Sequence, residues 1–329
     1  MKLVPLFFPF FLTLFLSPLF KALALKLGFL DDPSRGSKIH QRPIPYLGGM
    51  AIFSSFLLSL AIFNFTLPYY LLVSVLAFLL LGTLDDLLDI RALYRLPLQF
   101  LFALVTIYTA WRFPFIPIRY LNSLLVVLFI MGAVNSFNCW DVVDGSAGAT
   151  SLAIAFSLLI YSFIFGKDIP FLIVLIGCIL GWLPHNLHPA SMFMGDGGSY
   201  FLSAILSATA LQISSQLSPL QGLLPLFPFI YPCLDFIVVH YKRYRRGVKK
   251  LKPLLTSTDK DHLPHRLLAK VKSVNLTSLL LFFLVCFSSL LPIIFSPHLL
   301  YIPFALILGV YFILDRYLPP ALENKGSND

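Results

Sequence analysis

The feature that most constrains this chain is a series of apolar stretches, each about as long as one crossing of a lipid bilayer. A bilayer-spanning helix needs about 20 predominantly apolar residues, and such stretches recur throughout the 329 residues. They occupy residues 3–25, 47–67, 68–84, 97–111, 120–137, 147–165, 169–184, 199–217, 219–239, 274–295 and 298–317. The sequence therefore predicts an all-α, polytopic integral membrane protein with about 11 transmembrane helices, forming a single transmembrane domain over residues 1–329.

The distribution of positive charge predicts how these helices are oriented. When successive loops are assigned to alternate sides of the membrane, 20 of the 24 Lys and Arg residues fall on one side. Cytoplasmic loops carry an excess of Lys and Arg, so the richer side is the cytoplasm. The N-terminus is then outside, the C-terminus is cytoplasmic, and the basic loop at about residues 242–273 is cytoplasmic. The expected location is the cytoplasmic (inner) membrane, crossed many times.

Composition excludes several other classes of protein. Hydrophobic residues make up 58% of the chain and charged residues only 12%, whereas a soluble domain has about 45–50% and 25%. A soluble enzyme, a secreted disulfide scaffold and a disordered chain are therefore excluded. The net charge of +9 does not indicate a nucleic-acid partner, because the cations lie beside apolar stretches. There they set topology and attract membrane lipid.

The acidic residues are also segregated, and they form three clusters. Fourteen of the fifteen fall on the predicted cytoplasmic side, although acids contribute little to topology. The clusters are Asp85, Asp86 and Asp89 after the third stretch, Asp141 and Asp144 beside Asn138, and Asp196 in the turn MFMGDGGS. Several carboxylates beside glycine-rich turns suit a hard cation such as Mg²⁺, which binds through one or two carboxylates plus substrate phosphates. The sequence thus predicts a magnesium-dependent site on one face, with Mn²⁺ as the alternative metal.

Basic residues and histidines supply a complementary set of phosphate ligands. Lys38 lies in the first cytoplasmic loop, and His262, His265 and Arg266 lie in TDKDHLPHRLL. Two imidazoles and a guanidinium close together form a reasonable phosphate clamp. Because a proline disfavours helix in the preceding residue and lacks an N–H, Pro264 predicts an irregular turn in which His265 and Arg266 contact the phosphate.

Two other classes of function compete with an enzyme at this point. Intramembrane carboxylates can mark an ion path, as in an ion-coupled membrane transporter, but these acids lie at the ends of stretches rather than at the midplane, where transporters bind. A non-catalytic lipid-binding scaffold would not require carboxylates, histidines and glycine turns on one face.

Six segments carry a resemblance to a known family. They are KIHQRPIPYLGG, LGTLDDLLDIRALYRLPLQ, NSFNCWDVVDGSAG, GWLPHNLHPASMFMGDGGS, PCLDFIVVHYKRYRRG and DKDHLPHRLL. In this order the chain resembles the polyprenyl-phosphate N-acetylhexosamine-1-phosphate transferases, of the glycosyltransferase 4 type. It looks most similar to those that use UDP-N-acetylglucosamine and undecaprenyl phosphate, and less similar to the muramoyl-pentapeptide transferases.

The resemblance implies a role for each candidate residue. The catalytic residues would be Asp85, Asp86, Asp144 and His265, and Asp196 would be the magnesium ligand. The substrate-binding residues would be Lys38, Asn138, Asp141, Asn186, His262 and Arg266. Pro264 stands where relatives usually carry another histidine, which removes one imidazole from the clamp.

The implied reaction is a phosphoryl transfer at the cytoplasmic face. A polyprenyl phosphate would attack the sugar-bearing phosphorus of a UDP-sugar, giving polyprenyl-diphospho-sugar and UMP in the first membrane step of a cell-surface glycan pathway. The expected donor is UDP-GlcNAc; another UDP-N-acetylhexosamine and UDP-MurNAc-pentapeptide are the alternatives with the same chemistry. The sequence leaves a homodimeric assembly open.

Overall fold

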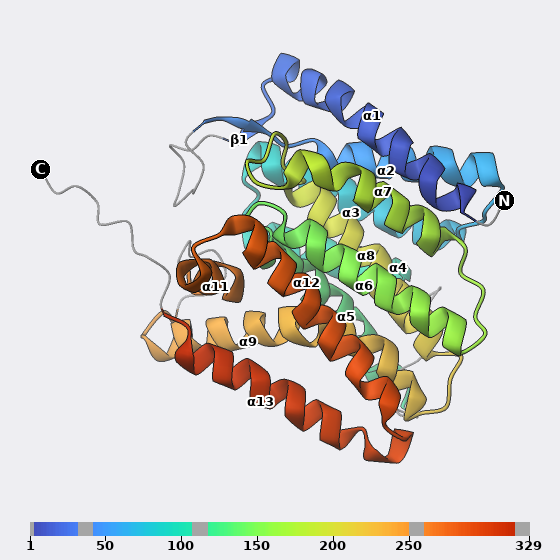
Figure 1. Ribbon diagram of the computed structural model, residues 1–329, viewed down its shortest axis with the longest axis vertical. Coiled ribbons are helices and arrows are strands. Elements are labelled where there is room, and N and C mark those ends of the chain that lie inside the picture. Colours follow the sequence, from blue (N-terminus) through green and yellow to red (C-terminus); the bar gives the residue numbers. More distant parts are fainter. Residues whose placement is uncertain (1–2, 32–41, 107–117, 250–259, 320–329) are drawn as a thin grey trace, which may run out of the picture.

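The computed structural model describes residues 3–31, 42–106, 118–249 and 260–319, and it is almost entirely helical (Figure 1). The long α-helices are α1 (Val4–Leu27), α2 (Gly48–Phe63), α3 (Tyr69–Leu88), α4 (Ala92–Thr106), α5 (Arg119–Trp140), α6 (Ser146–Ile164), α7 (Phe171–Asn186), α8 (Gly195–Ser214), α9 (Ile230–Arg245), α12 (Val274–Leu290) and α13 (Tyr301–Tyr317). The shorter helical segments are α11 (Leu263–Val271) and the 3₁₀ segments η1 (Gln221–Phe229), η2 (Leu291–Ile294) and η3 (Pro297–Leu299). Two short antiparallel strands, β1 (Leu30–Asp31) and β2 (Ile44–Pro45), complete the described elements.

Each of the eleven predicted apolar stretches coincides with one of these helices or with a 3₁₀ segment joined to one. Within the described residues, seven helical segments are long and apolar enough to cross a membrane, while α2, α4 and α7 are shorter apolar helices. The structure therefore confirms a multi-pass, helical membrane protein. The count of eleven crossings and the sides of the two termini stay predictions.

Helix α8 lies at the centre of the bundle (Figure 1). It packs against α2, α3, α5 and α6, and its residues are buried over almost the whole length. Because α8 contacts protein rather than lipid, it can include serines at positions 199, 203 and 207, whose hydroxyls donate to helix carbonyls. This burial explains a helix of 20 residues that is less apolar than the seven candidate spans.

A glycine on α3 permits the first turn of α8 to come close. A Cβ built on Gly82 would lie 2.4 Å from the backbone carbonyl atoms of Asp196 and 2.5 Å from the nitrogen of Gly197. Small residues allow helix backbones to approach in this way in membrane proteins. The contact places Asp196 beside the carboxylates three and four residues after Gly82.

We expect Gly82→Ala to lower both the thermal midpoint and activity, because the backbone of α8 would have to move. Overpacking of this kind costs about 1–3 kcal/mol. The matched control is Gly132→Ala on α5, where a Cβ would meet nothing within 4 Å and helix propensity improves. Thermal unfolding of the two variants in detergent is the measurement, and equal midpoints would contradict the close α3–α8 contact.

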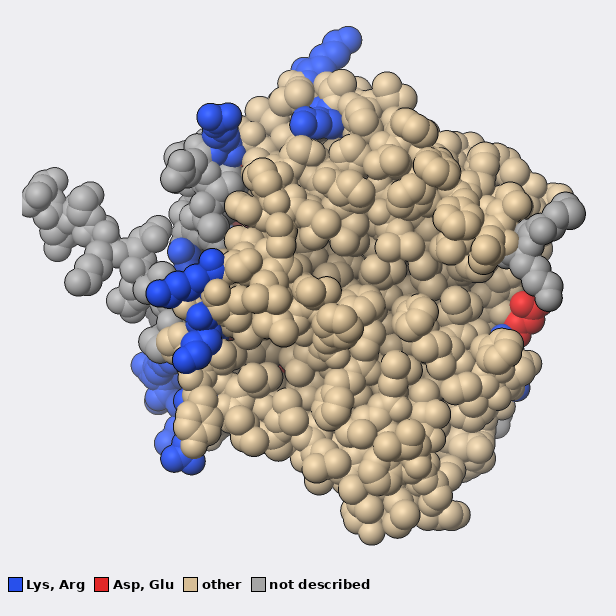
Figure 2. Space-filling model, in the orientation of Figure 1, with Lys and Arg blue, Asp and Glu red and all other residues tan. Residues whose placement is uncertain are grey.

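The surface shows a division between charged and uncharged regions. In Figure 2, Lys and Arg side chains gather along the left edge, where Figure 1 places α11 and β1, and the broad face beside them carries almost no charge. Exposed large apolar side chains cover several helices, for example Phe15, Phe163 and Phe283. An uncharged face bordered by basic residues is what a bilayer and its polar boundary require.

Candidate active site

The first candidate carboxylate, Asp85, lies one turn before the end of α3 and is held by three donors. Its Oδ2 accepts hydrogen bonds from Arg95 Nη1 at 2.6 Å and from the Tyr200 hydroxyl at 3.0 Å. Its Oδ1 accepts from the backbone N–H of Ile90 at 2.9 Å. Asp85 is buried, and this ion pair with Arg95 fixes the direction of its carboxylate.

The neighbouring Asp86 has a different set of partners. Its Oδ1 accepts from the backbone N–H of Asp196 at 3.1 Å, and its Oδ2 accepts from that of Gly197 at 3.4 Å. These N–H groups belong to the first turn of α8, which has no side-chain cap of its own. A carboxylate at a helix N-terminus satisfies orphan donors and interacts favourably with the helix dipole. Asp86 therefore fixes the beginning of α8 against α3.

Asp196 brings the acidic clusters together. It is the second residue of α8. Its carboxyl group interacts electrostatically with Asp85, with Asp141 and with the guanidinium of Arg95. Asp86 interacts with both Asp196 and Asp85. The carboxylates of α3, of α8 and of the loop after α5 thus lie within electrostatic range of Asp196.

Among the described residues, carboxylates outnumber cations in this site. Asp196 lies within electrostatic range of Asp85 and Asp141, and Asp86 within range of Asp85 and Asp196. Arg95 interacts with Asp85 and Asp196. Adjacent like charges are costly unless a cation or partner compensates them. Among the described residues, no three His, Cys, Asp or Glu side chains form a ready-made metal cage. The donor set instead fits Mg²⁺, which takes few protein ligands and completes its shell with water and phosphate.

The loop from Asp141 to Gly145 joins α5 to α6 and is tied to neighbouring segments. The carboxylate of Asp144 accepts from His188 Nδ1 at 2.7 Å and from the Ala190 N–H at 3.1 Å. The Ser278 hydroxyl of α12 donates to the carbonyl of Asp144 at 2.7 Å. These contacts place Asp144 on the outer side of the loop, next to the segment after α7.

Two asparagines connect this loop with the rest of the site. Asn138 Nδ2 lies 3.5 Å from the Tyr200 hydroxyl that donates to Asp85. Asn186 is buried; its Oδ1 accepts from the Gly145 N–H at 2.9 Å, and its Nδ2 donates to the Met192 carbonyl at 3.2 Å. Asn138 therefore lies next to the tyrosine that holds Asp85, whereas Asn186 connects the loop after α5 with the segment after α7.

The histidine motif corrects one prediction from the sequence. The irregular turn predicted at Pro264 is wrong, because residues Leu263–Val271 form the regular helix α11. Pro264 lies in the first turn, where an N–H has no intrahelical partner and the fixed φ of proline suits the helix. The N-cap is His262, which keeps an extended backbone.

The two histidines of this motif differ in environment. Burial alone would lower the pKa of His262, but hydrogen bonding to Asp235 and to Cys139 outweighs burial and raises it to about 10. Burial, together with the nearby charges of Lys260 and His262, lowers the pKa of His265 to about 4. At neutral pH, His262 is therefore a cation and His265 is neutral.

Arg266 is occupied elsewhere. Its Nη1 donates to Asp315 Oδ1 at 2.6 Å, and its Nη2 donates to the carbonyls of Asp315 and, at 2.9 Å, of Leu318. Arg266 thus donates to the last carbonyls of α13 and to Asp315. Because its guanidinium already has these partners, the predicted contact with phosphate is disfavoured. Lys38, the remaining candidate, lies outside the described residues.

Comparison with known proteins decides the family. The chain is 30% identical over 285 residues to the undecaprenyl-phosphate alpha-N-acetylglucosaminyl 1-phosphate transferase of Thermotoga maritima, covering 85% of this chain and 86% of the relative. Residues 68–214 match the family described as Glycosyl transferase family 4. The chain belongs to this family. The matched region runs from α3 to α8 and includes every carboxylate of the site described above.

Other relatives of this family 4 protein carry two kinds of name. The probable undecaprenyl-phosphate N-acetylglucosaminyl 1-phosphate transferase of Bacillus subtilis is 28% identical over 330 residues, covering 95% of this chain and 89% of the relative. The phospho-N-acetylmuramoyl-pentapeptide-transferase of a Thermoanaerobacter species is 31% identical over 278 residues, covering 74% and 85%. The first similarity extends over more of the family 4 chain.

The sequence did not indicate several residues of the site in this family 4 protein. Arg95 and Tyr200 hold Asp85, and Asp235 holds His262 at 2.8 Å. Arg95 and Asp235 lie in segments that the family resemblance covers, but spacing alone could not pair them with partners 10 and 27 residues away. Tyr200 is 115 residues from Asp85, and only the packing of α8 on α3 joins them.

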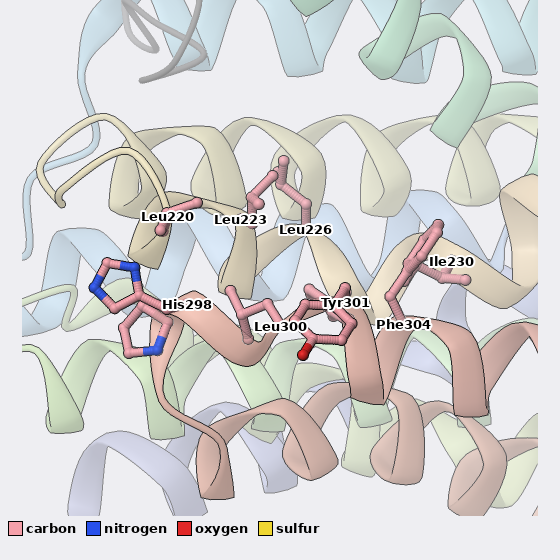
Figure 3. A pocket seen from close by; sticks show the side chains of 10 residues that line it. Leu220, Leu223, Leu226, Ile230, His298, Leu300, Tyr301 and Phe304 are labelled. Atoms are coloured by element: carbon pink, nitrogen blue, oxygen red, sulfur yellow. The ribbon is translucent and has the colours of Figure 1, made fainter.

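The family 4 protein also has an apolar cavity of about 520 Å³ away from the carboxylates (Figure 3). It lies between η1 and the beginning of α13, and its polar lining groups are His298 and Tyr301. Asp315, the carboxylate of α13, lies 14 residues after Tyr301, which is roughly 20 Å at the rise per residue of an α-helix. The cavity has no carboxylate in its lining, so it is not the site of the acidic cluster.

Proposed function

We propose that this protein transfers GlcNAc-1-phosphate from UDP-GlcNAc to a polyprenyl phosphate. An oxygen of the lipid phosphate attacks the sugar-bearing phosphorus, the bond from that phosphorus to the bridging oxygen breaks, and UMP leaves with that oxygen. The observation that carries the proposal is the convergence of Asp85, Asp86 and Asp141 on Asp196, with Arg95 beside Asp85 and Asp196. The names of the relatives in Thermotoga maritima and Bacillus subtilis support the same donor and acceptor.

Excess negative charge supports a magnesium site in this cluster. Asp196 is the ligand that the donor set favours, with Asp85 or Asp141 next to it. Bound Mg²⁺ would compensate the negative charge of the donor diphosphate and of the departing UMP. Without such a cation the anionic diphosphate would meet several carboxylates, so we expect activity to require Mg²⁺ and to accept Mn²⁺.

The two aspartates of α3 have different roles in this proposal. A phosphate monoester has a second pKa of about 6, so the lipid phosphate is mostly dianionic at pH 7 and needs no strong general base. Asp85, fixed by Arg95 and Tyr200, orients the reacting groups. Asp86 positions Asp196 through the backbone of α8. Positioning and charge compensation are the main requirements of phosphoryl transfer.

The remaining candidates act on the donor or on its loop. Asn138 and Asp141 lie next to the central carboxylates and are proposed to contact the nucleotide sugar. Asp144 and Asn186 hold the loop that carries Asp141. We propose that the whole site lies at the cytoplasmic face of the inner membrane. Lys and Arg side chains gather at the edge of the molecule that carries α11 (Figure 2), and an excess of such residues marks the cytoplasmic side.

A second candidate donor is UDP-MurNAc-pentapeptide. One observation favours it, the 31% identity with a phospho-N-acetylmuramoyl-pentapeptide-transferase. The chemistry at phosphorus would be the same, and the discrimination would lie in contacts to the sugar substituent.

The donor and the orientation can be tested together in sealed vesicles, because UDP-sugars do not cross a bilayer. Inside-out and right-side-out vesicles containing the protein, and vesicles without it, receive polyprenyl phosphate and one of several UDP-sugars, with Mg²⁺ or with a chelator. We expect UMP release from UDP-GlcNAc in inside-out vesicles with Mg²⁺. Faster UMP release from UDP-MurNAc-pentapeptide would identify that nucleotide sugar as the donor instead. UMP release confined to right-side-out vesicles would show that the site faces the other side of the membrane.

A further inference from the structure

Asp235, in the first half of α9, is a buried carboxylate that accepts four hydrogen bonds. Its Oδ2 accepts from Trp140 Nε1 at 3.0 Å and from His262 Nδ1 at 2.8 Å. Its Oδ1 accepts from the backbone N–H of Leu263 at 3.1 Å and from the Tyr311 hydroxyl at 3.2 Å. An ionised carboxylate has about four lone-pair sites, so these donors saturate it.

The saturated carboxylate joins elements that are far apart in the sequence. Trp140 is the last residue of α5, directly before the loop from Asp141 to Gly145. His262 is the N-cap of α11, and Leu263 is its first residue. Asp235 is 1% exposed and has no lone pair left for a substrate. Its contribution to the reaction must therefore act through the groups that it holds.

His262 is the titratable group among these donors. Its Nδ1 is bonded to Asp235, and the ring also hydrogen-bonds Cys139 at the end of α5, two residues before Asp141. The His240 ring of α9 lies 6.3 Å away, and His265 interacts from α11. Tyr311 of α13 reaches the same carboxylate. Among these groups, Asp235 is the carboxylate that hydrogen-bonds the imidazole.

We propose that Asp235 is a positioning residue for the transfer reaction, which holds His262 as an Nδ1-bound imidazolium and aligns it with the end of α5. His262 Nε2–H then serves as a fixed, charged donor to the diphosphate of the nucleotide sugar beside the loop at Asp141. The arrangement is that of a buried carboxylate behind a functional histidine, which fixes the ring and stabilises its charge. This role rests on the proposed function, because it requires an anionic donor at the site.

The variant that tests this is Asp235→Asn, which preserves shape and removes charge. Without the carboxylate, burial lowers the pKa of His262 below its ordinary value, and the ring is neutral at pH 7.5. We expect kcat to fall about 10- to 150-fold, the equivalent of one charge-assisted hydrogen bond. Because His262 of the variant binds its proton only as the pH falls, the ratio of variant to wild-type kcat should rise as the pH is lowered from about 8 to 6. Titration of the lipid phosphate affects both proteins equally and cancels in this ratio.

Two further variants separate positioning from folding. Tyr311→Phe removes another donor to Asp235 and leaves His262 in place, so a smaller loss and an unchanged pH profile are expected. His262→Gln removes the ring itself, and adding Asp235→Asn to it should have no further effect on kcat. Additive losses, or a ratio of Asp235→Asn to wild-type kcat that stays flat with pH, would overturn the proposal.

A spectroscopic measurement addresses the charge of His262 directly. Protein labelled with ¹⁵N-histidine, with the His262 signals assigned from His262→Gln, should show both ring nitrogens protonated at pH 8 in the wild type. A neutral His262 in the wild type would overturn the proposal, even if Asp235→Asn does not fold. If His262 is charged but the wild type transfers no sugar phosphate, the failure belongs to the proposed function and not to the Asp235–His262 arrangement.

Discussion

Asp196→Asn should abolish transfer while leaving the helical bundle intact. A neutral amide is a poor ligand for Mg²⁺, and loss of the charge stabilisation that a metal gives is worth several kcal/mol. About 4 kcal/mol corresponds to three orders of magnitude in kcat. The fold should persist because Asp86 holds α8 through the backbone N–H of Asp196, which asparagine retains. The measurement is kcat at saturating and at limiting Mg²⁺.

The matched control for this variant is Asp89→Asn. Asp89 ends α3 a few residues from the site, is exposed, and adopts a left-handed backbone conformation that asparagine tolerates well. Both variants remove one negative charge from the same region, but Asp89→Asn should keep wild-type kcat. Near-normal turnover of Asp196→Asn at limiting Mg²⁺ would end the metal role of Asp196.

The second large effect is expected for Asp85→Asn. The substitution leaves the Arg95 guanidinium without its carboxylate at 2.6 Å, and breaking a buried ion pair costs about 3–5 kcal/mol. We expect kcat/KM to fall at least about 100-fold. Because part of this energy can appear as lost stability, the rate is to be normalised to the folded fraction of the purified protein.

Tyr200→Phe provides the comparison for Asp85→Asn. It removes one of the other donors to Asp85, at 3.0 Å, and keeps the carboxylate and its ion pair. The loss of one hydrogen bond to a charged group predicts a reduction of about 10-fold or somewhat more. An Asp85→Asn enzyme that retains more than about half of the wild-type rate would exclude Asp85 from the site.

Local patterns were enough to predict the helices and the location of the acids. Apolar runs of bilayer length are a strong signal, and each predicted stretch coincides with a helix. The sequence also predicted that Asp85, Asp141 and Asp196 lie on one face, and in the structure Asp85 and Asp141 are within electrostatic range of Asp196. Helices α2, α4 and α7 are shorter than the seven candidate spans, and the count of eleven crossings stays a prediction.

What the sequence did not predict depends on tertiary packing. Asp86 looked equivalent to Asp85, yet it bonds to the backbone of α8, because Gly82 permits that backbone to approach. Pro264 was interpreted as a helix breaker, whereas its position in the first turn makes it compatible with helix. Arg266 was assigned to phosphate, but α13 supplies its partners from 49 residues further along the chain. Such pairings depend on helix arrangement, which residue spacing does not encode.

The central claim is that a sugar phosphate, and not a sugar alone, moves to the lipid. UDP-GlcNAc labelled in its sugar-bearing phosphate distinguishes the two directly when the purified protein is incubated with polyprenyl phosphate and Mg²⁺. The account predicts that the label enters the lipid fraction in equal amount to the UMP released. Label that remains in released UDP, with an unlabelled glycolipid, would contradict it.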